Sequence, residues 1–544
     1  MSAQPNQADA AVGVAAAAGV AAAVFAAFET DEVVLDLEER RAQSSDVYSR
    51  GVTAAAVLRP RSKSRCAEMV AAANQAGLAV IGRGGGLSYT GGYLPVHEQA
   101  VILDTSRLDR IVEVNADDMY ITVEAGVTWK RIYDTLAPLG LRLPFFGTFS
   151  GAQATVGGGL SNGALFLGTA RHGTGADHVL GLEVVLADGS LLATGQRAFK
   201  NVDKPFYRTC GPDLTGLFTH ESGAFGIKVE ATFKLMRMPA CNGHASFVFN
   251  SMQAAGAALS AVARTGAAEE AYVFDPESTR KNLRSEGLID DAGMLLKVAR
   301  SEAGWFQGLV EGAKLVAAGR KFLPEQAYSL HLTCAARSEA ALAADLEDCR
   351  EACVVHGGQE VANSIPKAIR ANLFPPPDGV LGTEGERWAA LNAKVAHSDA
   401  SKIMAASARV IDPYRERMRE HGVWMTHLLI AIGTTAFSFE PVLRWHDEWL
   451  PIHGRALSPA ARERLSEPAP NPAARELVAE IRQRLVELFA ELGAASNQLG
   501  KTYPYFESLR PEAAKFVGAL KNTIDPAGAM NPGVLGLPPP HRHR

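Results

Sequence analysis

The chain has 544 residues, of which 47% are hydrophobic and 21% are charged, and its net charge is −5. This composition is typical of a globular protein, and the length predicts about three to four domain-sized units. No block of basic residues stands out, which argues against nucleic acid as a partner. The six cysteines form no CxxC pair. We therefore expect free thiols, a reducing cytoplasmic location and no bound metal.

The N-terminal segment, residues 1–49, is rich in alanine. Residues 11–28 carry no charge, and a run of that length raises the question of a membrane span. Alanine and glycine are only weakly apolar, however, and no lysine or arginine precedes the run. We therefore expect neither a membrane span nor a signal peptide. The prediction is a disordered start followed by a helix that packs as far as Phe28.

The next part of the chain alternates strand and helix patterns. Apolar runs and cap residues predict, in order, a strand at 54–57, a helix at 62–75 capped by Ser62, strands at 77–81 and 100–104, a hairpin of 110–115 and 120–124, a helix at 128–136, and strands at 179–186 and 228–235. After Pro239 glycine clusters become rare. Strands at 329–334, 425–432 and 435–442 then alternate with helices at 338–356, 400–421 (broken near Pro413) and 473–492.

Two glycine-rich stretches interrupt these elements. The first has six glycines among the eleven residues 82–92. A turn so poor in side chains exposes consecutive N–H groups, which form a concavity suited to a phosphate, and Arg83 adds positive charge. The second stretch, 151–163, would let the backbone lie flat against a planar ligand. Neither matches the G-x-G-x-x-G dinucleotide fingerprint, and the alternative for the first is an ordinary surface turn.

Taken together, several stretches resemble the vanillyl-alcohol oxidase / p-cresol methylhydroxylase family of flavoproteins. The matching stretches are RGGGLSYTGG (83–92), ATVGGGLSNG (154–163), TGADHVLGLEVVLADG (174–189), DLTGLFTHESGAFGI (213–227) and DPAGAMNPG (525–533). The resemblance implies an α+β fold. In it, residues 50–240 form an FAD-binding domain of two α+β subdomains, 241–500 form a substrate-binding cap with an antiparallel sheet, and 501–544 return to the FAD-binding domain.

The resemblance also implies which residues hold FAD. The pyrophosphate would bind the first glycine turn, the flavin and ribityl chain the second, and the adenosine a segment near residue 225. The residues assigned to cofactor binding are Arg83, Gly84, Gly85, Gly86, Leu87, Ser88, Tyr89, Gly92, Thr155, Val156, Gly158, Gly159, Asn162, Gly163, Glu221, Gly223, Ile227 and Asn531.

The chain departs from the family pattern at positions that matter for chemistry. Leu87 and Gln153 stand where some members attach flavin through histidine or cysteine, so FAD is expected to be non-covalent. Phe149 or Ser150 stands where phenol-oxidising members carry an aspartate, which argues against a phenolic substrate. The cap strands lack the histidine-rich metal segment of members that oxidise D-2-hydroxy acids, so a metal-assisted site is less favoured.

The sequence offers five candidates for catalysis: Tyr503, His427, Arg444, Glu440 and Lys501. Proton removal must accompany hydride loss from an alcohol, and Tyr503 is predicted to touch the substrate oxygen, with Arg444 or His427 lowering its pKa. The alternative for Tyr503 is aromatic packing at the seam between the domains.

The resemblance predicts an FAD-dependent oxidoreductase that oxidises an alcohol or benzylic carbon, with oxygen or an electron carrier as acceptor. A homodimer is expected. The alternatives are a D-2-hydroxy-acid dehydrogenase and a non-redox transferase similar to ether-lipid synthases.

Overall fold

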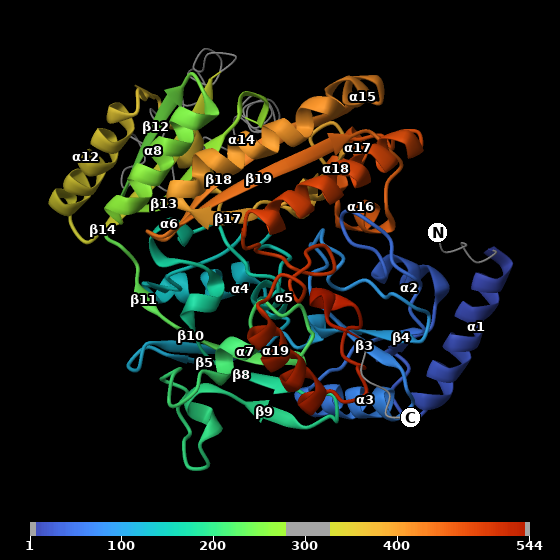
Figure 1. The fold of residues 1–544 in the computed structure, drawn as a ribbon. Helices are drawn as coiled ribbons and strands as arrows, with labels where there is room; N and C mark the ends of the chain where they lie inside the picture. The colour runs from blue at the N-terminus through green and yellow to red at the C-terminus, as the bar shows by residue number, and fades with distance from the viewer. Residues whose placement is uncertain (1–6, 279–326, 539–544) are drawn as a thin grey trace.

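The structure is a computed structural model that describes residues 7–278 and 327–538 (Figure 1). Its described strands form four sheets, and the fold is mixed α+β, as the sequence predicted. In Figure 1 the eight-stranded sheet and its helices lie above, and the smaller sheets lie below. Among the described residues, no helix is both long enough and apolar enough to cross a membrane. All six cysteines lie in the described part of the chain and are free thiols.

The first sheet carries the first glycine turn at the end of one strand. Strands β2, β4 and β3 run parallel, β1 joins the edge antiparallel, and α3 packs on the sheet with Ser62 as its N-cap. Ala21 and Phe25 anchor the N-terminal helix on this core, which confirms the packing helix. The elements are α1 (Gln7–Val24), β1 (Val33–Val34), α2 (Leu37–Gln43), β2 (Ala56–Leu58), α3 (Lys63–Gln75), β3 (Ala79–Arg83) and β4 (Ala100–Asp104).

The second sheet is antiparallel, with the order β5-β6-β10-β8-β9. The buried ring of Trp129 packs against Phe145 and Phe233, which ties α4 to the sheet. The elements are β5 (Ile111–Asn115), β6 (Tyr120–Glu124), α4 (Trp129–Leu136), α5 (Val156–Ser161), α6 (Thr169–His172), β8 (Val179–Val185), β9 (Leu191–Ala193), α7 (Leu214–Leu217) and β10 (Ile227–Lys234). A small pair, β7 (Leu141–Arg142) and β11 (Met236–Arg237), lies beside it.

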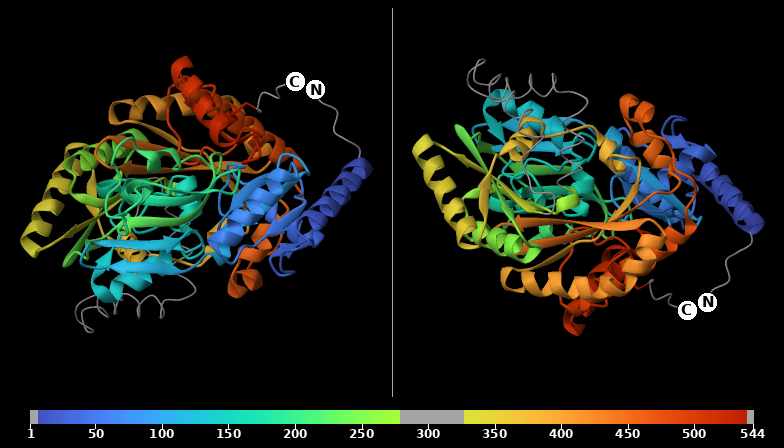
Figure 2. Two further views of the ribbon diagram at one scale, coloured as in Figure 1. Left: turned by 90° about the horizontal axis from the view of Figure 1, so that it is seen from below. Right: turned by 90° about the horizontal axis from the view of Figure 1, so that it is seen from above.

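The third and largest sheet is antiparallel and has the order β15-β12-β14-β13-β18-β19-β16, with β17 also on β19. Its helices α8, α12, α14 and α18 share one core with its strands, on the side away from the smaller sheets (Figures 1 and 2). The elements are β12 (Cys241–Phe249), α8 (Met252–Thr265), β13 (Ala268–Phe274), β14 (Tyr328–Ala336), α12 (Glu339–Val355), β15 (Gln359–Val361), α13 (Ser364–Ala371), β16 (Arg387–Ala390), β17 (Ala393–Ala396), α14 (Ala400–Ile411), α15 (Arg415–Glu420), β18 (Val423–Ile432), β19 (Ala436–Trp445), α16 (Pro451–Ala456), α17 (Pro459–Arg464) and α18 (Pro472–Glu491).

The end of the chain returns to the first sheet. After α19 (Pro511–Ile524), residues 529–531 run beside β3: Val80 N–H donates to Ala529 O at 2.8 Å, and Asn531 N–H donates to Val80 O at 2.9 Å. Lys521, at the end of α19, donates to the carbonyl oxygens of Ala224 and Met530. The C-terminal segment therefore packs along β3 of the first sheet and also bonds to the loop at Ala224, which precedes β10 of the second sheet. The break predicted near Pro413 is also present, because a 3₁₀ turn over 412–414 separates α14 from α15.

Candidate functional site

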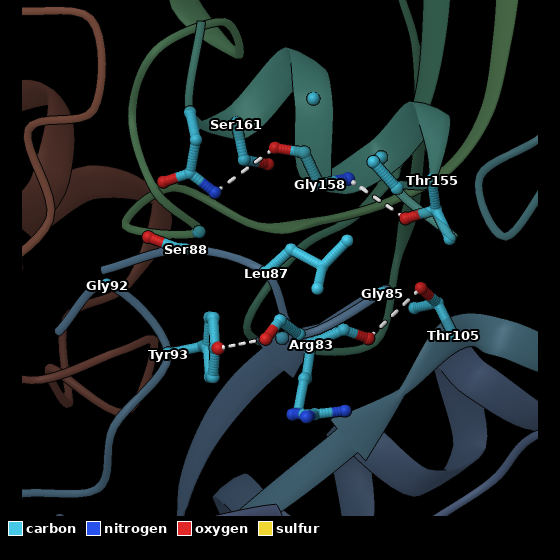
Figure 3. A pocket seen from close by; sticks show the side chains of 18 of the residues that line it. Arg83, Gly85, Leu87, Ser88, Gly92, Tyr93, Thr105, Thr155, Gly158 and Ser161 are labelled. Carbon is cyan, nitrogen blue, oxygen red and sulfur yellow. Dashed lines mark hydrogen bonds between the residues drawn. The ribbon is translucent and has the colours of Figure 1, made fainter. Parts of the chain in front are cut away.

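A cavity lies between the two glycine-rich stretches, and the close-up in Figure 3 shows how its labelled residues surround it. Its lining joins backbone groups of both glycine-rich stretches to a few polar side chains, as is typical of a cofactor pocket. Most of the residues predicted to bind cofactor line it: Arg83, Gly84, Gly85, Gly86, Leu87, Ser88, Gly92, Thr155, Gly158, Gly159, Asn162, Gly223 and Ile227.

The first glycine turn fits closely against the second stretch because it lacks side chains. A Cβ at Gly84 would lie 2.2 Å from Thr155 Oγ1, and one at Gly85 would lie 2.4 Å from Gln153 O. Gly86 has φ +73°, and a Cβ there would lie 2.1 Å from the Arg83 guanidinium. The turn therefore keeps its backbone N–H groups close to the cavity, as a phosphate site requires.

Arg83 places positive charge beneath this turn. Its guanidinium lies over the ring of Tyr93, 5.2 Å from the centroid, and its buried Nε has no hydrogen-bond partner among the described residues. The Tyr93 hydroxyl donates to Gly86 O at 2.6 Å (Figure 3). A cation held under exposed N–H groups suits a pyrophosphate, so the donor set fits FAD.

The second glycine stretch differs from the prediction. It forms the short helix α5, capped by Thr155, rather than a flat segment. A Cβ at Gly157 would lie 2.9 Å from Ala125 Cβ, and one at Gly159 would lie 2.7 Å from Trp129 Cζ2. These two glycines therefore allow close packing of α5 on the second sheet, while Gly158 and Asn162 line the cavity.

Five of the predicted cofactor residues do not line the cavity: Tyr89, Val156, Gly163, Glu221 and Asn531. Val156 packs in the second core, and Glu221 is ion-paired with Lys228 in the protein interior. The Asn531 amide donates to Gly92 O and Ser222 O and accepts from Lys501. Asn531 and Glu221 thus hold loops in place around the cavity.

Sequence reasoning missed several cavity residues, among them Tyr93, Trp129, Lys228 and Gln498. Gln498 accepts a hydrogen bond from Ser88 Oγ at 2.9 Å, so it links the first glycine turn to the segment that follows α18. No local motif marks Gln498, because this contact joins residues far apart in the chain.

The large sheet turns one face toward the FAD-binding sheets, here called the cavity-facing side, and the other toward its own helices. On β18 and β19, Phe437, Phe439 and Leu443 pack in the helix-side core, whereas Leu428 and Ile430 pack with the second sheet. Because successive side chains alternate, even-numbered residues of these two strands face the cofactor side. Among the predicted catalytic residues, Glu440 and Arg444 lie on this cavity-facing side, and His427 does not.

Glu440 is a half-buried acid on β19 whose carboxyl lies beside Asn392. Burial raises the pKa of its carboxyl to about 7. Asn392 Nδ2 lies 3.5 Å from Glu440 Oε2 and donates to Ser438 Oγ at 2.6 Å. Burial and then the charge of Glu440 raise the pKa of Tyr89, which places the carboxyl near that turn. A carboxyl with a pKa near neutrality is suited to accept a proton.

Tyr503 also lies beside Asn392, but its pKa is raised and not lowered as predicted. Its hydroxyl accepts a hydrogen bond from Asn392 N at 2.7 Å, and burial raises its pKa to about 12. Arg444 is paired elsewhere and His427 lies on the opposite face, so neither lowers this pKa as predicted; the charge of Arg482 lowers it, but by less than burial raises it. Tyr503 stays protonated at neutral pH, so it can donate a hydrogen bond but does not serve as a base.

The other three candidates are held by protein partners. Arg444 pairs with Glu386 at 3.3 Å and donates to Thr426. His427 stacks on Phe439 and lies 3.5 Å from Asp275. Lys501 Nζ donates to Asn531 Oδ1 and Leu94 O, and burial lowers its pKa to about 7. No cluster of three metal-binding side chains is found within residues 7–278 and 327–538.

Comparisons with known proteins agree with this site. The family model described as "FAD binding domain" matches residues 54–195. D-lactate dehydrogenase [cytochrome] 1 of Saccharomyces cerevisiae is 26% identical over 269 residues, which is 48% of this chain and 44% of that protein. The chain spans less than half the length of the curated relatives it matches.

Two solved structures share the fold over nearly the whole chain. p-Cresol methylhydroxylase with substrate bound has a TM-score of 0.68 at 18% identity, and the match covers 96% of both chains. Alkyldihydroxyacetonephosphate synthase has a TM-score of 0.64 at 15% identity, covering 94% of this chain and 84% of that one. At these identities the likeness establishes the fold.

The fold and the glycine-lined cavity define a flavoprotein whose cofactor is FAD. Residues 54–195 thus form an FAD-binding domain, and the chain as a whole shares the fold of p-cresol methylhydroxylase and 4-ethylphenol oxidase.

Proposed function

We propose that the protein oxidises an alcohol or benzylic carbon of a small organic molecule in an FAD-dependent reaction. The observation that carries this proposal is Glu440, a half-buried acid with a pKa near 7 on the cavity-facing side of the large sheet. When bound in the cavity, FAD supplies the acceptor for the hydride. The chain's own residues bind the substrate, exclude water and manage the proton.

Glu440 is proposed to take the proton from the substrate hydroxyl. The deprotonated carboxyl is the active form, and burial keeps about half of the groups in that form near pH 7. Asn392 positions it, because its side chain reaches Glu440 and Ser438 while its backbone N–H donates to Tyr503. Asn392 Oδ1 is buried and has no hydrogen-bond partner among the described residues, so it is free to accept a bond from substrate.

The test is anaerobic flavin reduction, followed by absorbance, with a panel of alcohols, phenols, hydroxy acids and amines. The reduction rate with an active alcohol should rise with pH through about 7 and then level off. Glu440→Gln should lower the rate on the order of a hundredfold and flatten the pH profile, since it removes the base. The matched control is Glu420→Gln at an exposed position of α15, which should behave as wild type. A Glu440→Gln enzyme that reduces flavin at the wild-type rate would remove Glu440 from the mechanism.

A second candidate is oxidation of a D-2-hydroxy acid, favoured by the 26% identity to a D-lactate dehydrogenase over 269 residues. Lactate and glycolate in the panel test it directly. A non-redox transferase reaction would leave the flavin oxidised with every substrate. We further propose oxygen or an electron-carrier protein as acceptor, non-covalent FAD because of Leu87 and Gln153, a homodimer and a cytoplasmic location.

A further inference from the structure

One lysine on the face of the large sheet that carries Glu440 has no bonded partner for its ammonium group within the described residues. Lys394 lies on β17 directly opposite Ser438 of β19, so it shares a face with Glu440. Its ammonium group makes no ion pair or side-chain hydrogen bond within the described part of the chain. Arg444 and Lys501, by contrast, are held by carboxylate or carbonyl oxygens.

The position of Lys394 is fixed from two sides. Its backbone N–H donates to Ala495 O at 2.7 Å, and Ala495 N–H donates back to Lys394 O at 3.0 Å. The segment that begins at Ala495 leads within three residues to Gln498, which lines the cavity. Within this segment, Asn497 passes close to the second glycine stretch: a Cβ added at Gly163 would lie 2.8 Å from Asn497 O. The strand and this segment thus place Lys394 beside the stretch of chain that leads to the cavity residue Gln498.

The surroundings of the amine disfavour a charge without a ligand. Burial lowers the pKa of Lys394 to about 8, and the charge of Asp177 opposes this effect in part. Asp177 is exposed and already accepts hydrogen bonds from Thr174. His220, the other titratable group that senses Lys394, has a pKa lowered to about 4 by burial and is neutral at pH 7. The ammonium form, which dominates at pH 7, lacks an anion close by.

We propose that Lys394 binds a carboxylate carried by the substrate, so that the oxidised molecule is an alcohol that also bears an acid group. This deepens the proposed function and rests on it for the reaction. The proposal rests on the face that Lys394 shares with Glu440, its fixed place beside the segment that leads to Gln498 and its missing partner. The apolar strip of Leu428 and Ile430, on the same face, suits the carbon skeleton of such a molecule.

The experiment uses the FAD-loaded enzyme and pairs of ligands that differ in charge alone. Benzoate and benzamide are titrated while the flavin absorbance spectrum is followed, which reports binding without turnover. para-(Hydroxymethyl)benzoate and its amide, and lactate and lactamide, are compared as substrates in anaerobic flavin reduction. Variants are Lys394→Met, Lys394→Arg and, as a matched control, Lys402→Met at an exposed position of α14.

We expect wild type to bind benzoate at least tenfold more tightly than benzamide, with the preference falling above pH 8 as Lys394 loses its proton. Lys394→Met should abolish the preference and leave benzamide binding unchanged, because it removes an ammonium and no packing partner. Lys394→Arg should keep the preference and remove its decline above pH 8. Lys402→Met should match wild type.

An undiminished preference for benzoate in Lys394→Met would overturn the proposal. A second result would also overturn it: the flavin midpoint potential of Lys394→Met falls while its preference for benzoate is kept. The lysine would then balance charge on the reduced cofactor and would not bind the substrate. The two proposals fail separately. If benzoate binding depends on Lys394 but no alcohol reduces the flavin, the anion site stands and the oxidation of alcohols is wrong.

Discussion

At the scale of single residues, the site is defined by one half-buried acid and by the group that positions it. Asn392 joins Glu440 to Tyr503: its side chain reaches the acid and its backbone N–H reaches the tyrosine oxygen. Since the pKa of Tyr503 is raised to about 12, the phenol keeps its proton across the working pH range. We therefore propose that Tyr503 is a positioning residue whose influence on the reaction passes through Asn392.

Tyr503→Phe tests that role. The change leaves Asn392 N–H without its acceptor in a buried place, which costs roughly 1–3 kcal/mol and lets the loop around Asn392 shift. We expect anaerobic flavin reduction to slow by about tenfold to a hundredfold, with the FAD spectrum unchanged and with a shift in the pH midpoint assigned to Glu440. Stopped-flow absorbance at several pH values measures both effects.

The matched control is Tyr505→Phe, at a half-buried tyrosine two residues away. It should leave both the rate and the pH midpoint as in wild type. A Tyr503→Phe enzyme that is slower but keeps the wild-type midpoint would instead place the phenol against the substrate. An unchanged rate would show that the tyrosine serves only the packing of its core.

At the scale of elements, the sequence predicted the strands and helices well where their patterns are local. Strand β4 was predicted with its observed bounds, and Ser62 and Thr128 cap α3 and α4 as their positions before apolar runs indicate. The second glycine stretch has a further role that its pattern did not predict. Its small residues line the cavity, and two of its glycines also allow close approach to Ala125 and Trp129. A glycine pattern reports that something comes close to the backbone, and the tertiary fold decides what that is.

The same limit explains the errors in the candidate site. His427 and Glu440 lie on adjacent strands, yet alternation of side chains places them on opposite faces of the sheet. The register that decides this depends on pairing between β18 and β19, which the sequence alone did not specify. Gln498 and Lys501 owe their places to contacts with the first glycine turn, more than 400 residues earlier in the chain.

Contact between the two glycine stretches should be essential for FAD binding. A Cβ at Gly84 would lie 2.2 Å from Thr155 Oγ1, so Gly84→Ala must push the stretches apart. We expect the purified variant to carry less than about a tenth of the FAD of wild type, since a shift of the turn by less than an ångström removes several N–H contacts at once. The ratio of flavin to protein absorbance measures this directly.

Gly454→Ala in α16 is the control for that change, because a Cβ there meets nothing within 4 Å. Alanine favours helix more than glycine does, so this variant should keep its FAD and be slightly more stable. If Gly84→Ala retained full FAD content, the first turn would not be the phosphate site.

At the scale of the whole molecule, a buried ion cluster joins the large sheet to the cofactor-side sheets. Glu269 of β13 pairs with Arg370 of α13 at 2.5 Å and with Arg142 of β7, and His172 lies 3.4 Å from it. The guanidinium carbons of Arg142 and Arg370 lie 4.6 and 4.8 Å from the centroid of the Phe146 ring. Burial alone would raise the pKa of the Glu269 carboxyl, but the charges of both arginines hold it well below its usual range.

Removal of the Glu269 charge should therefore loosen the large sheet from the rest of the protein. Glu269→Gln leaves the buried guanidinium of Arg142 without its counter-ion, while Arg370 keeps Glu270; breaking a buried pair in this way typically costs about 3–5 kcal/mol. We expect a lower apparent midpoint of thermal unfolding and release of FAD at a lower temperature than in wild type, followed by flavin fluorescence. Because the folded-state pKa of Glu269 is depressed, its contribution is present at neutral pH and is lost only as the pH falls below that of an unfolded glutamate. The difference between variant and wild type should thus shrink in acid.

Glu38→Gln is the control. Glu38 pairs with Arg41 on the surface, where such pairs contribute little, so this variant should unfold as wild type does. Equal midpoints for Glu269→Gln and Glu38→Gln would mean that apolar packing, and not this ion cluster, holds the large sheet in place.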